Sequence, residues 1–164
     1  MTFSILAHDP GTGIFAAGAA TGSLCVGGWV LRGDIESGLV ASQGTAPSSF
    51  WRDDILRRMY QGAGAEAAVR AVTETDRGRG HRQVIALDRT GATAGFTGGD
   101  SIGWAGHDAG RNCAVAGNML TGAQVLEALR ASPIETSSPA TSNLKALRAA
   151  QQAGGDMRGL QSAA

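Results

Sequence analysis

The chain has 164 residues, a length typical of one domain, and its 14 Lys and Arg residues balance 14 Asp and Glu residues. A net charge of zero argues against the basic surface that nucleic acids and anionic membranes attract. We therefore predict a single domain over residues 1–164 that has no nucleic-acid partner and no membrane partner.

The cysteines and the N-terminus indicate a reducing compartment. Cys25 and Cys113 lie far apart, and neither belongs to a CxxC motif, so we expect buried free thiols rather than a zinc site. The N-terminus lacks the basic segment and compact apolar core of a secretory signal. Residues 11–31 carry no charge, but glycines interrupt them, which is typical of short buried strands rather than a membrane-spanning helix. We predict a cytoplasmic protein without a cofactor.

The first half of the chain predicts strands followed by two helices. Strands are expected over residues 2–8, 14–20 and 38–44, and the turn signal at residues 9–13 joins the first two as an antiparallel hairpin. Residues 23–31 fit either an irregular strand or a loop. A helix is expected to begin at residues 47–49, with Asp53 and Asp54 near its first turn, and a second helix to cover residues 63–75.

The second half repeats this order. Residues 82–87 and 92–97 predict a hairpin around a turn that ends in Gly91. A glycine-rich passage follows, then a strand over residues 113–116. Two helices are expected over residues 122–131 and 143–153, separated by a Ser/Thr-rich loop at residues 133–139, and no strand is expected in the tail from residue 156.

Strands, a helix pair, strands and a second helix pair do not alternate as in a parallel α/β sheet. We therefore predict an α+β fold in which two antiparallel sheets pack face to face, each with a helical pair outside.

Thr2 directly follows the initiator Met1. If Met1 is removed, the α-amine of Thr2 titrates near pH ~8 and can accept the proton of the Thr2 hydroxyl through one bound water. Thr2 would then carry both a nucleophile and its own base. The alternative is that Thr2 is simply the first residue of a strand.

The glycine-rich region offers further polar candidates. Asp100, His107 and Asn118 have side chains that form hydrogen bonds or transfer protons, but the residues by themselves favour a loop folded on its own polar network. His8-Asp9 and His107-Asp108 could supply ligands to a metal if the loops met. Since neighbouring strand residues point to opposite faces, neither pair is a ready chelate, and we predict no metal.

Five stretches of the sequence carry a family resemblance: TFSILAHDPGTG, ASQG, GFTGGDSIGWAGH, NCAVAGNML and GGDMRGLQSAA. Together they resemble the DUF1028 family of uncharacterised proteins over nearly the whole chain. That family is classed with the Ntn-hydrolase fold, a four-layer αββα sandwich of antiparallel sheets that proteasome subunits share. The resemblance therefore implies the same layered architecture as the order of predicted elements.

The resemblance also implies a function, namely an Ntn-type amidohydrolase that acts on a small amide or acyl substrate. The implied nucleophile is Thr2, with an oxyanion held by backbone N–H groups or by Asn118. The implied catalytic residues are Thr2, Asp100, His107 and Asn118. The implied substrate-binding residues are Asp9, Thr97, Asp156 and Arg158.

The sequence departs from the family pattern in two places. Thr21-Gly22 stands where we expect a Ser-Lys pair in relatives, so an ammonium that would depress the pKa of the nucleophile is missing. Relatives are also expected to continue past Ala164 into another strand, and we predict a homodimer that covers the open sheet edge. These departures keep open the alternative of a non-catalytic small-molecule-binding or assembly protein on the same scaffold. The two His-Asp pairs leave a weaker alternative, a metal-dependent hydrolase that uses His8, His107 and nearby carboxylates.

Overall fold

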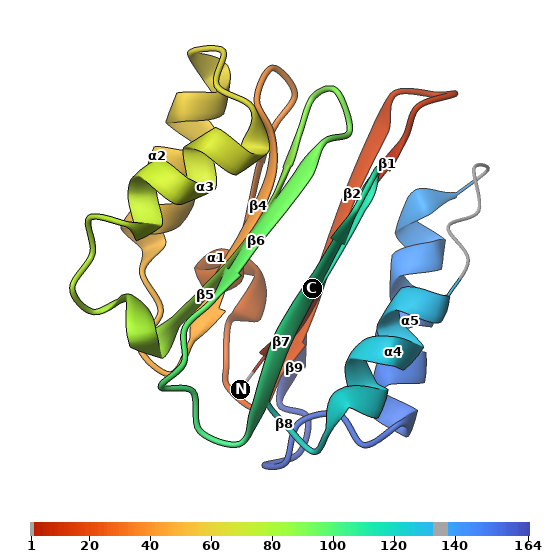
Figure 1. Cartoon of the computed structure of the whole chain (residues 1–164). Coiled ribbons are helices and arrows are strands. Elements are labelled where there is room, and N and C mark those ends of the chain that lie inside the picture. Colours follow the sequence, from red (N-terminus) through yellow and green to blue (C-terminus); the bar gives the residue numbers. More distant parts are fainter. Residues whose placement is uncertain (1, 133–137) are drawn as a thin grey trace.

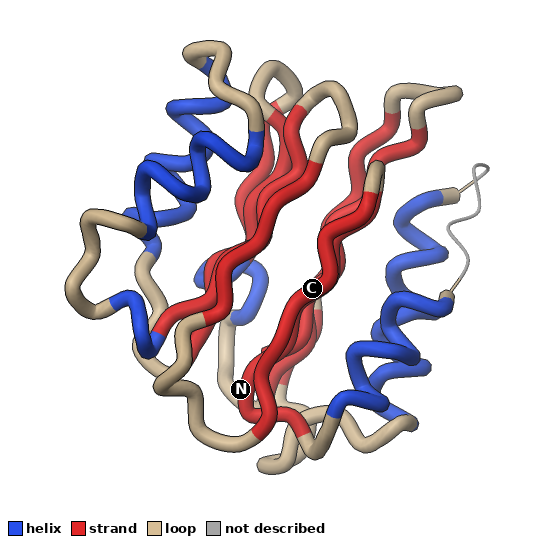
Figure 2. The backbone as a smooth tube through the Cα atoms, in the orientation of Figure 1, coloured by secondary structure: helices blue, strands red, loops and turns tan. Residues whose placement is uncertain are grey.

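The computed structural model describes residues 2–132 and 138–164, in which two antiparallel sheets lie face to face (Figures 1 and 2). The first sheet contains, in spatial order, β7 (Trp104–Gly110), β8 (Cys113–Leu120), β1 (Thr2–Asp9), β2 (Ile14–Thr21) and β9 (Ser162–Ala163). The second contains β3 (Leu31–Asp34), β4 (Gly38–Gly44), β5 (Arg82–Asp88) and β6 (Thr93–Thr97).

Helices cover the outer face of each sheet (Figure 1). The second sheet carries α2 (Ser49–Tyr60) and α3 (Ala65–Thr73), and the first carries α4 (Ala123–Ala131) and α5 (Pro139–Gln152). The short helices α1 (Val26–Val30) and η1 (Arg79–His81) lie in the connections before β3 and β5. The predicted α+β fold with two antiparallel sheets and external helical pairs is therefore confirmed.

Three apolar clusters hold the layers together. One packs β1 and β8 against α4 and α5, with Phe3, Ile5 and Leu129 at its centre. A second packs β4 and β5 against α2 and α3, and the third fills the space between the sheets around Leu6 and Ile85. Strand alternation explains the division, because odd and even residues of β1 face opposite sides of the sheet. Even residues of β1 therefore face the second sheet.

The structure corrects several predicted elements in the first half and at the C-terminus. Residues 23–31 contain the helix α1, which was not predicted because its two glycines are poor helix formers. Helix α2 begins at Ser49 with Ser48 as its N-cap, so Asp53 and Asp54 lie beyond the first turn, contrary to prediction. The tail contains the short strand β9, which pairs with the end of β2.

The region from residue 98 to residue 153 needs larger corrections. The passage predicted as glycine-rich loop contains β7, which pairs with β8 along its length, and β8 itself continues to Leu120. Helix α5 begins at Pro139 rather than Asn143, since proline fits the first turn of a helix. Most of the predicted loop at residues 133–139 falls on residues 133–137, outside the described residues.

No helix among the described residues combines the length and the apolar character needed to cross a bilayer.

Candidate functional site

A cavity of about 300 Å³ opens at the end of the sandwich where β1 begins. The elements around it are β1, β2, β4, β8, α1, the loops that follow β2 and β4, and the loop between α5 and β9. Its lining residues are Thr2, Thr21, Ser23, Leu24, Val26, Trp29, Val30, Ser42, Gln43, Gly44, Thr45, Pro47, Met119 and Arg158.

Thr2 lines this cavity and is nearly buried, with 8% of its surface exposed. As the first residue of β1, it pairs with Thr21 of β2 on one side and with Asn118 of β8 on the other. Directly opposite residues of antiparallel strands project from the same face, so the three side chains lie side by side. The Thr2 hydroxyl donates a hydrogen bond of 3.1 Å to Oγ1 of Thr21. The register thus fixes the Thr2 hydroxyl at the cavity.

Asn118 is fully buried, and neither its Nδ2 nor its Oδ1 has a hydrogen-bond partner in the part of the chain that the structure describes. Buried amide groups are almost always paired, so an unpaired amide directly beside Thr2 is unusual. The next residue, Met119, has a φ of 54°, a left-handed conformation that costs a non-glycine residue about 1–2 kcal/mol. The end of β8 is therefore both strained and polar beside Thr2, which is typical of functional sites.

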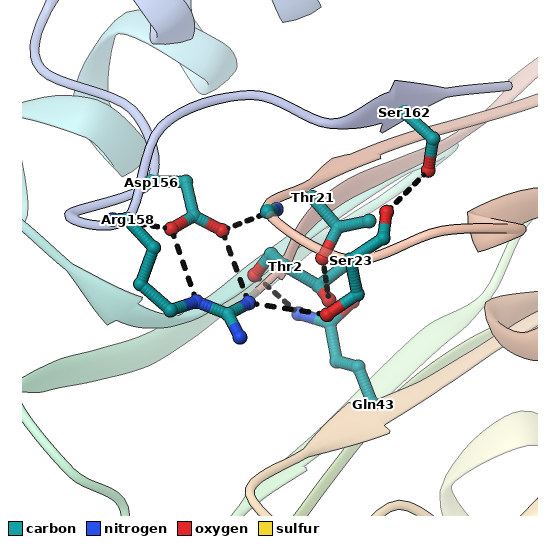
Figure 3. A network of polar contacts seen from close by, with 8 residues as sticks. Thr2, Thr21, Ser23, Gln43, Asp156, Arg158 and Ser162 are labelled. Atoms are coloured by element: carbon teal, nitrogen blue, oxygen red, sulfur yellow. Dashed lines mark hydrogen bonds and ion pairs between the residues drawn. The ribbon is translucent and has the colours of Figure 1, made fainter.

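Arg158 reaches the cavity from the C-terminal loop (Figure 3). Its guanidinium lies 3.4 Å from Oδ2 of Asp156 and donates to the hydroxyl of Ser23 at 3.3 Å. The Asp156 side chain is completely buried and also accepts hydrogen bonds from the main-chain N–H groups of Gly22, at 2.5 Å, and Arg158, at 2.7 Å. The buried carboxylate therefore ties the end of β2 to the loop that carries Arg158.

A buried pair of amides connects Thr2 to the second sheet. Gln43 donates to the carbonyl oxygen of Thr2 at 3.1 Å and to Oε1 of Gln83 at 2.7 Å, and it accepts a hydrogen bond from Ser4. Gln83 in turn donates to Oγ1 of Thr97 at 2.8 Å and to the carbonyl oxygens of Gly106 and Gly117. These two side chains bond the main chain of β1, β7 and β8 to the second sheet beside the cavity, which Gln43 lines.

The predicted residues His107 and Thr97 meet each other, but they do not line the cavity. Oγ1 of Thr97 lies 2.8 Å from Nδ1 of His107, and both are on edge strands of the facing sheets. The His107 ring packs directly on Gly95, whose added Cβ would lie only 2.3 Å from the ring. Burial of this ring face lowers the pKa of His107. The chain of hydrogen bonds through Gln83 and Gln43 links this pair to Thr2.

Asp100 and Asp9 also lie outside the cavity. Asp100 is exposed and sits 3.9 Å from His81, next to η1. Asp9 is at the far end of β1, where its carboxylate accepts hydrogen bonds from Gly11 and Thr12 and closes the first hairpin. These hydrogen bonds lower the pKa of Asp9. Of the eight predicted site residues, the structure therefore gathers Thr2, Asn118, Asp156 and Arg158 at one place.

The histidine ligands of the metal alternative are not brought together. His8 stacks on Phe15 with ring centroids 4.4 Å apart and bonds to Asn112, whereas His107 contacts Thr97. Within residues 2–132 and 138–164, no group of three or more His, Cys, Asp or Glu side chains could hold a metal ion.

Sequence reasoning missed Thr21, Ser23, Gln43 and Gln83 as members of the site. A signal existed for the two glutamines, because each is a long polar residue next to the apolar or small residues of a strand, in GLVASQG and RQVIALD. A buried polar side chain in such a strand needs a partner across the sheet interface. Thr21 carried no such signal, since its role depends on the pairing register.

Comparisons with known proteins give a family but no activity. A family model described as "Family of unknown function (DUF1028)" matches residues 2–164. A crystal structure of a protein from Silicibacter pomeroyi, assigned to the same family model, superposes with a TM-score of 0.88. The two chains share 46% sequence identity, and the match covers 99% of this chain and 73% of the other. No curated protein matches the chain.

Proposed function

The chain belongs to the DUF1028 family, and we propose that it is an amidohydrolase in which Thr2, exposed by removal of Met1, acts as an N-terminal nucleophile on a small amide or acyl substrate. The observation that carries the proposal is the Thr2 hydroxyl at the wall of the 300 Å³ cavity, held by Thr21 beside an unpartnered buried amide among the described residues. Met1 itself lies outside the described residues.

The proposed reaction uses groups of Thr2 alone for proton transfer. The free α-amine takes the hydroxyl proton through a bound water while Oγ1 attacks the substrate carbonyl carbon. The amide C–N bond then breaks, and the nitrogen leaves with the proton from the α-ammonium. Water attacks the resulting ester, its C–O bond breaks, and Oγ1 regains a proton. Each step balances without a metal or a cofactor.

Asn118 is the candidate for stabilising the oxyanion. Its side chain projects from the same face as that of Thr2, and residues opposite each other on antiparallel strands have Cβ atoms roughly 5 Å apart. An amide N–H group that is preorganised in a buried site stabilises the negative charge that develops in the transition state more than it stabilises the ground state. We expect Asn118→Ala to reduce acylation of Thr2 by about 100-fold, the typical effect of losing one oxyanion donor.

Acylation by an alkyl β-lactone tests the proposal, because ring opening by Thr2 leaves a covalent ester that intact-mass spectrometry detects. We expect one adduct per chain, on the N-terminal peptide, in protein that begins at Thr2. Thr2→Ser is expected to react and Thr2→Ala to give no adduct. An adduct that persists in Thr2→Ala would contradict the proposed nucleophile.

One observation favours a second function, that of a non-catalytic small-molecule-binding protein. Gly22 stands where a lysine was expected, and the basic residue among the described lining residues is Arg158, which pairs with buried Asp156. This alternative predicts ligand binding that Thr2→Ala leaves unchanged and no β-lactone adduct in the parent protein. The expected homodimer is part of either proposal, and sedimentation equilibrium measures it.

A further inference from the structure

The charge pattern of the cavity indicates what kind of molecule it takes. Among its described lining residues, none is an Asp, Glu, Lys or His, and the charged residue is Arg158. The Arg158 side chain is 44% exposed, whereas the Asp156 carboxylate beside it is completely buried. A ligand in the cavity therefore meets the guanidinium and not the carboxylate.

Asp156 orients Arg158 through hydrogen bonds that leave the guanidinium at the cavity. The shortest hydrogen bonds to this carboxylate come from two main-chain N–H groups, of Gly22 and Arg158, while the guanidinium nitrogens lie 3.4 Å away. Charge-assisted bonds in a tight pair are typically shorter, about 2.7–2.9 Å. Ser23 supports the guanidinium from the other side. A fixed guanidinium of this kind suits a planar anion such as a carboxylate.

The remaining lining separates into a polar part and an apolar part. Oγ1 of Thr45 is a buried hydroxyl that has no hydrogen-bond partner within the described residues, so it can bond to a ligand. Leu24 and Trp29 lie at the cavity with 74% and 59% of their surfaces exposed, and a ligand with an apolar group would cover them. The volume of about 300 Å³ corresponds to roughly ten water molecules at about 30 Å³ each, which limits the ligand to a small molecule.

We propose that the cavity binds a small amide that bears a carboxylate within a few bonds of the amide group, as an N-acyl amino acid does, and that Arg158 binds this carboxylate. The inference rests on the proposed function for the position of the amide at Thr2. It assigns to Arg158 the selection of anionic over neutral substrates.

Binding without turnover tests this assignment. N-butyrylglycine and its methyl ester have the same acyl group but differ in charge, and calorimetric titration into Thr2→Ala protein measures the affinity of each. We expect the acid to bind about 10-fold to 100-fold more tightly than the ester, the range for a charge-assisted hydrogen bond. Arg158→Gln should remove this preference, Arg158→Lys should retain part of it, and Arg89→Gln, at an exposed turn outside the cavity, should retain all of it.

Equal binding of acid and ester, or no binding of either, would overturn the inference, and this comparison needs no Arg158 variant to fold. A preference that survives in folded Arg158→Gln would overturn it as well. Failure of the two proposals is distinguishable. A β-lactone adduct together with equal acid and ester affinities contradicts the carboxylate site alone, whereas Arg158-dependent binding without any adduct contradicts the hydrolase alone.

Discussion

Gly22 has no room for a side chain, although a lysine was expected at this position in relatives. A Cβ built there would lie 2.7 Å from Oδ2 of Asp156 and 2.7 Å from the carbonyl oxygen of Gly159. Real side chains do not approach a main-chain oxygen so closely, so the loop that carries Arg158 would have to move. The cationic group of the site is therefore the guanidinium of Arg158 and not a side chain at position 22, directly after β2.

Replacing Gly22 is therefore expected to destabilise the fold. Gly22→Ala should lower the free energy of unfolding by about 1–3 kcal/mol, the usual range for inserting a methyl group into a packed region. Gly28→Ala is the matched control, because a Cβ there meets nothing within 4 Å and the residue lies in helix α1. The control should be neutral or stabilising by about 0.5–1 kcal/mol. Urea unfolding of both variants measures the difference. Equal changes in the free energy of unfolding would contradict the prediction, because they would mean that Asp156 and Gly159 move away from the added methyl group without cost.

Part of the site could be predicted at the level of single residues. The resemblance named Thr2, Asn118, Asp156 and Arg158, which the structure gathers at one end of the sandwich. The resemblance also named Asp9, which lies at the opposite end of β1 from Thr2. A motif gives the identity of a polar residue but does not show at which end of a strand that residue lies. Thr21 could not be predicted, since a shift of one residue in the pairing of β1 and β2 would place another side chain beside Thr2.

At the scale of elements, β4 and β5 contribute a polar connection between two otherwise apolar sheet faces. Gln43 and Gln83 are directly paired across these strands and are 1% and 0% exposed. Their amides bond to main-chain oxygens of Thr2, Gly106 and Gly117 in the other sheet. Strand β1, which carries Thr2, is therefore held by hydrogen bonds as well as by packing.

Replacing one glutamine is expected to lower the free energy of unfolding by more than the hydrogen bonds of that side chain contribute, because its partners are left unpaired. Gln83→Leu should lower the free energy of unfolding by about 2–4 kcal/mol, because Gln43 and two carbonyl oxygens then lose a partner in a buried site. The double variant Gln43→Leu, Gln83→Leu should cost less than the sum of the two single variants, since neither amide is left alone. Additive effects within about 0.5 kcal/mol in urea unfolding would mean that the two amides act independently.

The same scale shows which elements could be predicted. The hairpins of β1 with β2 and β5 with β6 have clear turn signals and apolar strands, and they form as expected. Strand β7, with the sequence WAGHDAG, has small and polar residues that favour no strand by themselves, and it forms because β8 offers a complete row of pairing groups. Strand β9 has only two residues, too few for any periodicity. Tertiary pairing therefore decided the two strands that were missed.

For the molecule as a whole, the order of elements was sufficient to predict two sheets with external helices, because each amphipathic element must bury one face. The three apolar clusters between successive layers are the outcome. The position of the cavity could not be predicted in this way, since it depends on loops at one end of the layers.

Acidification is expected to destabilise the protein below pH about 6.5 through His107. Burial lowers the pKa of this histidine below its ordinary value of 6.5, so the unfolded chain binds the proton more readily than the native chain does. Stability therefore rises with pH between the native pKa and 6.5 and is lost as the pH falls through this window. The lowered pKa values of Asp9 and Asp88 act in a separate window, below their ordinary value of 3.8.

His107→Gln tests this assignment. The free energy of unfolding of the parent protein should fall between pH 7.5 and pH 5.5, and the variant should show a smaller fall, because it lacks the group whose protonation favours the unfolded state. Urea unfolding at both pH values gives the two differences. An unchanged pH dependence in the variant would assign the effect to other groups.

The central claim, that Thr2 is an N-terminal nucleophile, depends on a free α-amine at Thr2. A small second residue favours removal of the initiator methionine, and the Thr2 hydroxyl already lies at the cavity. Intact-mass spectrometry of the protein purified from its own host measures the N-terminus directly. We predict a chain that begins at Thr2, with the mass of the printed sequence less one methionine; a chain that retains Met1 would contradict the proposed mechanism.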